Sequence, residues 1–281
     1  MKHLTEAMDG QTLRKFVTIH VIKGAWQVVM LFRYELIRRD SRNIDEDTMS
    51  GDLKSRKLTW WPADKDQDLQ VLCKVLTEGD SKLDSLHITS SGVTDEGVKH
   101  IAEALSNSHC QLNSLNLGWC MVADEGVKHI AEALSSSHCH LNSLNLSWCK
   151  VTDEGVKLIA EALSNSHCHL NSLDLGWCKV TDEGVKHIAE ALSNIHCHLN
   201  SLDLRGCKVT DEGVKYIAET LSNSHCHLNS LDLRYNDVTD EGAKHLAEAL
   251  EHSKYQLKSF SCLQIEVRAE VKGQVSEEGL S

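Results

Sequence analysis

The stretch LNSLNLSWCKVTDEGVKLIAEALSNSHCH, residues 141–169, recurs as near-copies along this chain of 281 residues. The leucines that open the copies stand 29 residues apart, at Leu83, Leu112, Leu141, Leu170, Leu199, Leu228 and Leu257. The chain therefore holds six full repeats and the start of a seventh. A fixed period of this length is typical of solenoid proteins, in which each unit is stable only against its neighbours.

Each repeat divides into a strand half and a helix half. Leucines at positions one, four and six give the first half one buried face, as in a short strand. In the second half, Val98, Ile101, Ala102 and Leu105 fall on one face of a helix. Strands pack about 4.8 Å apart and helices about 10 Å apart. The sequence therefore predicts a curved α/β solenoid with parallel strands on the concave face and helices on the convex face.

The residues before each helix carry start signals. Thr94 is the expected N-cap of its helix, and Asp95 and Glu96 occupy the first turn, where the helix dipole favours negative charge. The second repeat has Ala123 at the cap position, so we expect Asp124 to take over the capping role. The carboxylates of these acidic pairs are expected at solvated helix ends.

The pattern LxxLxLxxCxVTDEGVKxIAEAL resembles the leucine-rich repeats of ribonuclease inhibitor and of the C-terminal domains of NOD-like receptors. It covers about residues 83–262. Proteins of the ribonuclease inhibitor type tend to alternate two repeat lengths, so the uniform period is closer to the receptors. This resemblance implies protein–protein recognition by the concave surface, as a sensor or scaffold in innate immune signalling. The alternatives are binding of a basic enzyme, as ribonuclease inhibitor does, and regulation of a small GTPase.

The segments outside the repeats are assigned by their loss of pattern. Residues 51–82 are expected to form a degenerate N-terminal capping unit, because residues 64–76 align with a repeat helix. Trp60, Trp61 and Pro62 are expected to pack over the first true repeat. Residues 1–50 are an unassigned N-terminal helical segment, and residues 263–281 are a C-terminal tail.

Composition limits the partners and the compartment. The net charge of −12 argues against binding nucleic acid through basic contacts. The most apolar stretch, Val17 to Phe32, is interrupted by polar residues and is too short to span a membrane. The first residues lack the order of a signal peptide, so the 11 cysteines are expected to be reduced in the cytoplasm. The oligomeric state is left open.

Neither the cysteines nor the histidines predict chemistry. Two repeating cysteine positions are expected to fill core corners as small apolar residues, and redox-sensitive bridging is the alternative. His-Cys-His triplets, as at residues 138–140, contain zinc ligands, but a row of ligands does not converge on one ion. We therefore expect no metal and no cofactor. Hydrolase, metalloprotease and kinase motifs are absent, so the chain is not expected to be an enzyme.

Residues that vary on the strand face are the candidate partner-binding site. An aromatic column runs beside an acidic column, with two arginines next to them, and these residue types are enriched in interface hot spots. The candidate residues are Trp119, Trp148, Trp177, Tyr235, Asp174, Asp203, Asp232, Arg205 and Arg234. The alternative interpretation is that the indoles lie across the turn after each strand and merely cover the core.

Overall fold

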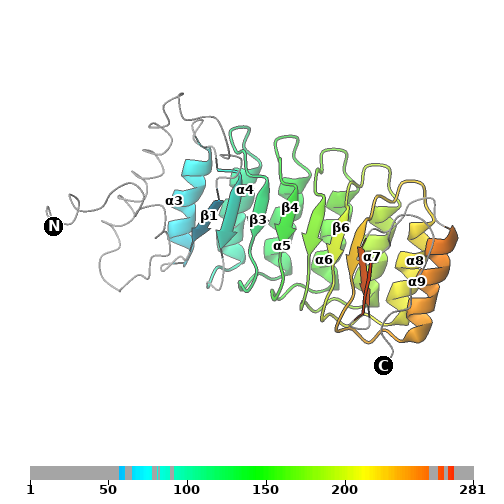
Figure 1. The fold of residues 1–281 in the computed structure, drawn as a ribbon. Coiled ribbons are helices and arrows are strands. Elements are labelled where there is room, and N and C mark those ends of the chain that lie inside the picture. The colour runs from blue at the N-terminus through cyan, green and yellow to red at the C-terminus, as the bar shows by residue number, and fades with distance from the viewer. Residues whose placement is uncertain are drawn as a thin grey trace, which may run out of the picture.

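Strands and helices alternate along the whole repeat region (Figure 1). The computed structural model describes residues 57–60, 65–77, 81, 83–88, 92–252, 259–262 and 265–268. Within these residues the strands are β1 (Lys57–Trp60), β2 (Ser85–Ile88), β3 (Ser114–Asn116), β4 (Ser143–Asn145), β5 (Ser172–Asp174), β6 (Ser201–Asp203), β7 (Ser230–Asp232), β8 (Ser259–Cys262) and β9 (Ile265–Arg268). The helices are α3 (Lys65–Thr77), α4 (Asp95–Leu105), α5 (Asp124–Leu134), α6 (Asp153–Leu163), α7 (Asp182–Leu192), α8 (Asp211–Leu221) and α9 (Asp240–His252).

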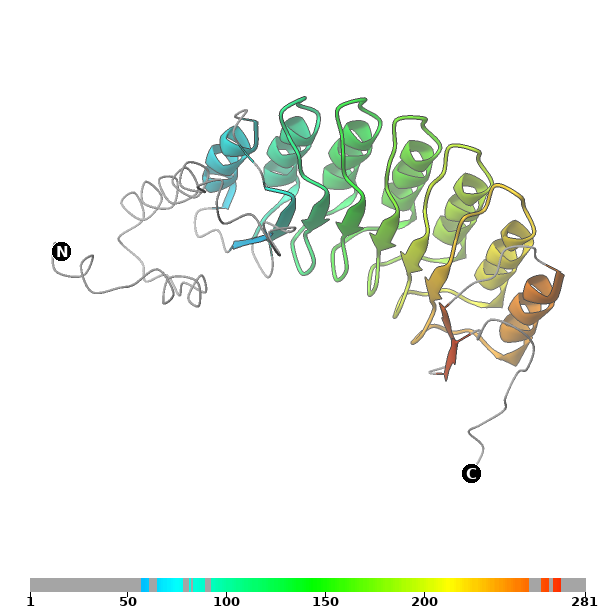
Figure 2. The same ribbon diagram turned by 45° about the horizontal axis from the view of Figure 1, so that its top comes forward.

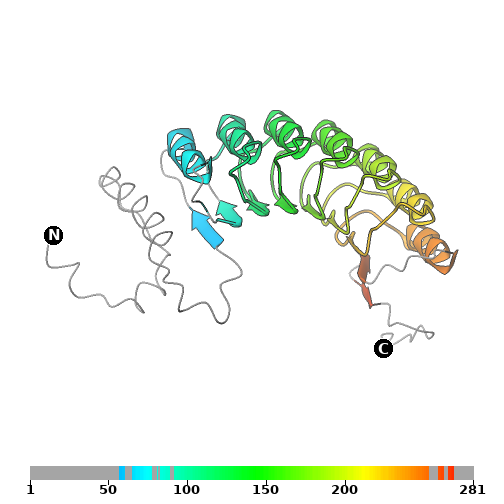
Figure 3. The ribbon, with the colours of Figure 1, turned by 90° about the horizontal axis from the view of Figure 1, so that it is seen from above.

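The strands form one sheet in chain order, and β1 to β8 are parallel. Equivalent residues pair from one repeat to the next, for example Leu115 with Leu144 and Leu144 with Leu173. The repeats turn through a smooth arc with the strands inside and the helices outside (Figures 2 and 3). This confirms the predicted solenoid, whose curvature follows from the closer spacing of strands than of helices.

The core lies between the strand layer and the helix layer. In the repeat that begins at Leu141, the strand leucines Leu141, Leu144 and Leu146 are buried, and so are Val156 and Ile159 of α6. The same positions are buried in the neighbouring repeats, and together they form one continuous cluster. Each buried leucine contributes about 1.5–3 kcal/mol relative to an exposed one, so stacking stabilises every unit.

The cysteines belong to this core. Ten of the 11 cysteines, from Cys73 to Cys226, are buried free thiols, as expected for small apolar residues. The thiol of Cys149 donates a hydrogen bond to the carbonyl oxygen of Leu117 in the preceding repeat, at 3.3 Å. Burial raises the pKa of Cys149 and of Cys207 to about 12. These thiols are therefore neutral and poorly nucleophilic at physiological pH.

The helix starts differ from the prediction, because the aspartates connect repeats. The carboxylate of Asp124 accepts hydrogen bonds from the backbone N–H of Thr152, at 2.8 Å, and from its hydroxyl, at 2.6 Å. Asp124 therefore bonds the next repeat instead of capping its own helix, whose N-cap, Ala123, makes no side-chain cap. The side chain of Thr94 does not cap α4 either, whereas that of Thr152 accepts a bond from the backbone N–H of Glu154. The prediction of solvated carboxylates holds for the exposed Glu125 but is wrong for Asp124, because it considered only one helix at a time.

These contacts also explain the glycine in the DEG motif. A Cβ atom built on Gly155 would lie 2.4 Å from Oδ1 of Asp124, closer than any stable contact. The corresponding glycines of the neighbouring repeats meet the same obstacle. Glycine at this position therefore lets the aspartate of one repeat reach the next.

Further elements extend the sheet and the helix layer beyond the full repeats. At the N-terminal end β1 pairs with β2, and α3 packs on α4 with Leu69, Leu72 and Leu76 buried. Residues 1–50, Trp61 and Pro62 lie outside the described residues. At the C-terminal end β9 pairs antiparallel with β8, within the segment assigned to a tail. The repeat pattern does not predict β9, because this strand runs antiparallel to its neighbour whereas the repeat strands are parallel.

Candidate functional site

Four aromatic side chains form a continuous column along the solenoid, which we call the aromatic ladder: Trp119, Trp148, Trp177 and Tyr235. Each lies in the turn that follows a strand. The rings of Trp119 and Trp148 stack with centroids 4.2 Å apart, and those of Trp148 and Trp177 with centroids 4.8 Å apart. Stacked aromatic pairs contribute about 0.5–1.5 kcal/mol beyond the area they bury.

All four aromatic residues adopt a left-handed backbone conformation. Their φ angles are 65° at Trp119, 61° at Trp148, and 62° at Trp177 and Tyr235. This conformation costs about 1–2 kcal/mol for a residue with a Cβ atom, whereas glycine adopts it freely. Gly206, at the same repeat position, has a φ of 62°. The fold itself therefore favours glycine here, and the aromatic residues are held against the backbone preference.

Gly206 keeps the ladder continuous. A Cβ atom at this position would lie 2.4 Å from the ring of Trp177, so the indole lies directly over the glycine. The rings of Trp177 and Tyr235 meet across it with centroids 5.7 Å apart and an interplanar angle of 30°. Glycine in a column of large aromatic residues is the sequence signal that could have indicated this contact.

The ladder is open to solvent. Trp119 is 58% exposed, Trp148 42%, Trp177 41% and Tyr235 54%. In the repeat that has Gly206 instead of an aromatic residue, the strand leucine Leu204 is still 0% exposed. The neighbouring ring of Trp177 lies over this glycine, so the ladder stays continuous in this repeat without a ring of its own.

A row of Asn and Asp side chains ends the strands beside the ladder, which we call the polar row: Asn116, Asn145, Asp174, Asp203 and Asp232. Each accepts, through Oδ1, a hydrogen bond from the backbone N–H two residues later, at 2.8 to 3.1 Å. This is the Asx-turn geometry. The polar row therefore fixes the turns in which the aromatic residues lie.

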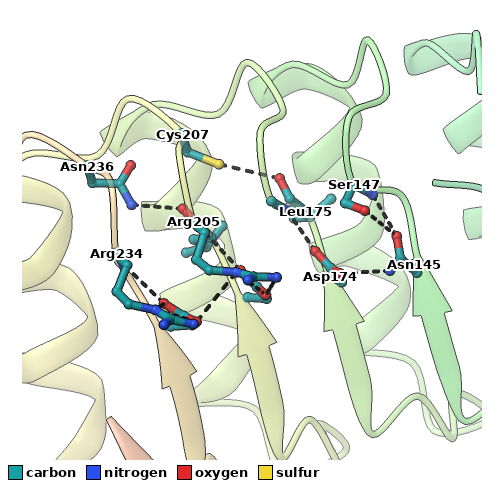
Figure 4. A network of polar contacts seen from close by, with 12 residues as sticks. Asn145, Ser147, Asp174, Leu175, Arg205, Cys207, Arg234 and Asn236 are labelled. Atoms are coloured by element: carbon teal, nitrogen blue, oxygen red, sulfur yellow. Dashed lines mark hydrogen bonds and ion pairs between the residues drawn. The ribbon is translucent and has the colours of Figure 1, made fainter. Parts of the chain in front are cut away.

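Two arginines offset the charge of the polar row (Figure 4). Nη2 of Arg205 lies 2.6 Å from Oδ2 of Asp203, and its Nε lies 3.4 Å from Oδ2 of Asp232. Nη2 of Arg234 lies 2.6 Å from the same oxygen of Asp232. Hydrogen bonding to Asp203 raises the pKa of Arg205, so its guanidinium stays charged. The structure thus brings all nine candidate residues together, as an aromatic ladder beside a polar row in which Asp203 and Asp232 pair with arginines.

No other part of the described chain offers a competing site of defined chemistry. The residues described contain no group of three or more His, Cys, Asp or Glu side chains that could hold a metal ion. The histidines flanking the buried cysteines, such as His138 and His140, are exposed along one edge. Within the described ranges, no helix is both long and apolar enough to cross a bilayer.

Comparison with known protein families identifies the repeats. The family described as Leucine Rich repeat matches residues 79–102, 108–131, 137–160, 166–189, 196–218 and 224–247, together just over half of the chain. No curated protein matches the chain.

Two solved structures illustrate the similarity. One is the leiomodin-1 actin-binding site 2, with 18% identity and a TM-score of 0.44, over 54% of this chain and 86% of that one. The other is an internalin from Listeria monocytogenes, with 20% identity and a TM-score of 0.32, over 63% of this chain and 55% of that one. Likenesses at this level carry no argument about function. The repeated family matches and the strand–helix solenoid together place this chain in the leucine-rich-repeat family.

Proposed function

We propose that this protein recognises another protein through the aromatic ladder and the polar row beside it. The observation that carries the proposal is the left-handed backbone at four exposed aromatic residues. Backbone strain at a position where glycine would fit is a recurring feature of functional sites. Exposed tryptophan and tyrosine are also the residue types that most often dominate binding energy in protein interfaces.

The energetics of the ladder support the same conclusion. Left-handed strain of about 1–2 kcal/mol at each of four residues, about 4–8 kcal/mol in all, opposes the stacking of three ring pairs at about 0.5–1.5 kcal/mol each, about 1.5–4.5 kcal/mol in all. The strain therefore offsets the stabilisation that stacking alone provides. The exposed apolar surface of the ladder would contribute to binding when a partner covers it, at about 25 cal/mol for each Å² removed from water.

The finer proposal is that this recognition serves a cytoplasmic sensor or scaffold in innate immune signalling. It rests on the resemblance of the repeats to those of NOD-like receptors and on the free thiols, which suit a reducing compartment. Binding of a basic enzyme is less favoured, because Arg205 and Arg234 already pair with two of the three aspartates. The described residues show no feature that favours regulation of a small GTPase.

Affinity capture with matched variants tests the proposal. The double variant Trp148→Gly/Trp177→Gly removes two rings and gives both positions the residue that Gly206 already places in this turn. Proteins retained by the wild type and lost by this variant are the expected partners, and a known innate immune component among them supports the finer proposal. Glu161→Gln, an exposed helix position, is the control and should retain them. Equal capture by all three proteins would contradict recognition by the ladder.

A further inference from the structure

One repeat departs from the way charge is balanced along the polar row. In successive repeats the row residue and the residue two positions later are Asn116 and Gly118, Asn145 and Ser147, Asp174 and Gly176, Asp203 and Arg205, and Asp232 and Arg234. A neutral amide is followed by a small residue, and an aspartate is followed by an arginine that pairs with it. Asp174 alone in this series is an acid followed by a small residue.

We propose that Asp174 receives an arginine side chain from the protein partner, in the place that Arg205 and Arg234 occupy in the next two repeats. This inference rests on the proposed function, because it assigns a specificity contact to the same surface. It commits to a partner segment that presents one arginine among apolar residues. The arginine would pair with the carboxylate while its neighbours cover the aromatic ladder.

The hydrogen bonds of Asp174 leave room for such a contact. Its Oδ1 accepts from the backbone N–H of Gly176 at 2.9 Å, and its Oδ2 accepts from Nδ2 of Asn145 at 2.7 Å (Figure 4). A carboxylate can accept about four hydrogen bonds, so about two acceptor positions remain. A guanidinium donates two parallel hydrogen bonds and matches this capacity better than an ammonium group does.

Asp203 shows how the vacant positions are filled elsewhere in the row. Its Oδ1 accepts from the backbone N–H of Arg205 at 2.9 Å, as that of Asp174 does from Gly176. Nε of Arg205 adds bonds of 2.9 and 2.7 Å to the two carboxylate oxygens. A partner arginine at Asp174 would therefore repeat an arrangement that this chain already makes within itself.

Nearby charges leave Asp174 uncompensated. Arg205 bonds Asp203 and Asp232, and its charge lowers the pKa of Asp174 only as a minor influence. Burial is the largest influence and raises the pKa of Asp174. A half-buried carboxylate without its own cation gains more from an incoming guanidinium than a fully solvated one does. Trp177, three residues later in the same turn, offers an apolar surface for the stem of the arginine.

The test uses peptides, because they separate this contact from the ladder. A phage-displayed random peptide library is selected on the full-length wild type and counter-selected on Trp148→Gly/Trp177→Gly. The expected peptides carry an arginine at one fixed position among apolar residues. Replacing this arginine by glutamine should weaken binding at least about ten-fold, as expected for hydrogen bonds between charged groups.

Two variants of the protein locate the contact. Asp174→Asn gives this repeat the amide found at Asn116 and Asn145 and so preserves the turn. Gly176→Arg supplies the missing cation from within the chain, as Arg205 does. Both should remove the advantage of the arginine peptide over the glutamine peptide, whereas Glu161→Gln should keep it.

The outcomes distinguish the inference from the proposed function. Peptides that need the ladder but contain no enriched arginine overturn the inference and leave the proposed function standing. An arginine advantage that persists in Asp174→Asn also overturns it. A wild type that selects no peptide beyond those bound by the double tryptophan variant contradicts the proposed function, and the inference fails with it.

Discussion

Replacing Asp153 with alanine removes one complete connection between two repeats. Its carboxylate accepts three hydrogen bonds from the following repeat: from the backbone N–H of Thr181 at 2.8 Å, from its hydroxyl at 2.6 Å, and from the backbone N–H of Gly184 at 3.1 Å. Hydrogen bonds to a charged acceptor contribute about 1.5–3 kcal/mol each when buried. Because this edge is half-exposed and water can replace part of the set, we expect a total loss of about 2–3 kcal/mol.

Two aspartates at the same motif position provide a graded control. Asp95 accepts one inter-repeat hydrogen bond, from the backbone N–H of Ala123 at 2.7 Å, so its replacement by alanine should cost about 1–2 kcal/mol. The side chain of Asp240, in the last helix, is exposed and has no hydrogen-bond partner among the residues that the structure describes. Its replacement should cost only the helix-dipole contribution of about 0.3–1 kcal/mol.

Urea unfolding followed by far-ultraviolet circular dichroism measures these losses. The predicted order of destabilisation is Asp153→Ala, then Asp95→Ala, then Asp240→Ala. A smaller denaturant slope for Asp153→Ala would mean that the repeats on its two sides unfold separately, which agrees with a broken connection. Equal losses at all three positions would refute the reasoning, because they would assign the aspartates to their own helices.

Three further predictions concern the ring over Gly206, the buried thiols and the carboxylate of Asp211. Gly206→Ala should displace the ring of Trp177 and cost at least about 1–2 kcal/mol, because it adds left-handed strain to a contact of 2.4 Å; an unchanged near-ultraviolet circular dichroism spectrum would contradict this. Cys149 and Cys207, whose pKa burial raises to about 12, should react with a thiol reagent at mildly alkaline pH only as fast as the protein unfolds, and rapid labelling of the folded protein would be inconsistent with that burial. The pKa of Asp211 is lowered by hydrogen bonds from the hydroxyl and N–H of the threonine in the next repeat. The contribution of Asp211 to stability is therefore present above the ordinary aspartate pKa and is lost as pH falls through the lowered value. The variant Asp211→Asn should lose less stability than the wild type below about pH 4. An equal loss of stability in both proteins would contradict the hydrogen bonds from the threonine.

The repeat architecture could be predicted from the sequence because each signal was repeated. Leucine spacing fixes which strand face is buried, and positions such as Leu173 and Ile188 recur with the same neighbours. The candidate aromatic column could be located for the same reason, since its register follows from the buried leucines. The structure places those aromatic residues together in the aromatic ladder.

Contacts between repeats were harder to predict than contacts within one. Within one repeat, the position of Asp124 predicts a residue that begins a helix. Its hydrogen bonds with Thr152 form only between two stacked repeats. The sequence predicts an acidic column at the polar row but not its backbone bonds or its pairing with Arg205, because these depend on turn geometry. Gly206 is the sequence signal for the left-handed turn, since glycine in a column of large residues indicates a backbone conformation that favours glycine.

The central claim is that the ladder binds a partner and does not hold the fold together. The dissociation constant of Trp148→Gly/Trp177→Gly for a protein captured by the wild type tests this most directly, with unfolding free energy measured on the same preparation. We predict an affinity loss of at least about 2 kcal/mol, typical of aromatic hot spots, with stability changed by less than about 1 kcal/mol. Unchanged affinity together with a stability loss of about 2–5 kcal/mol, the range for a leucine-to-alanine cavity in a core, would contradict the claim.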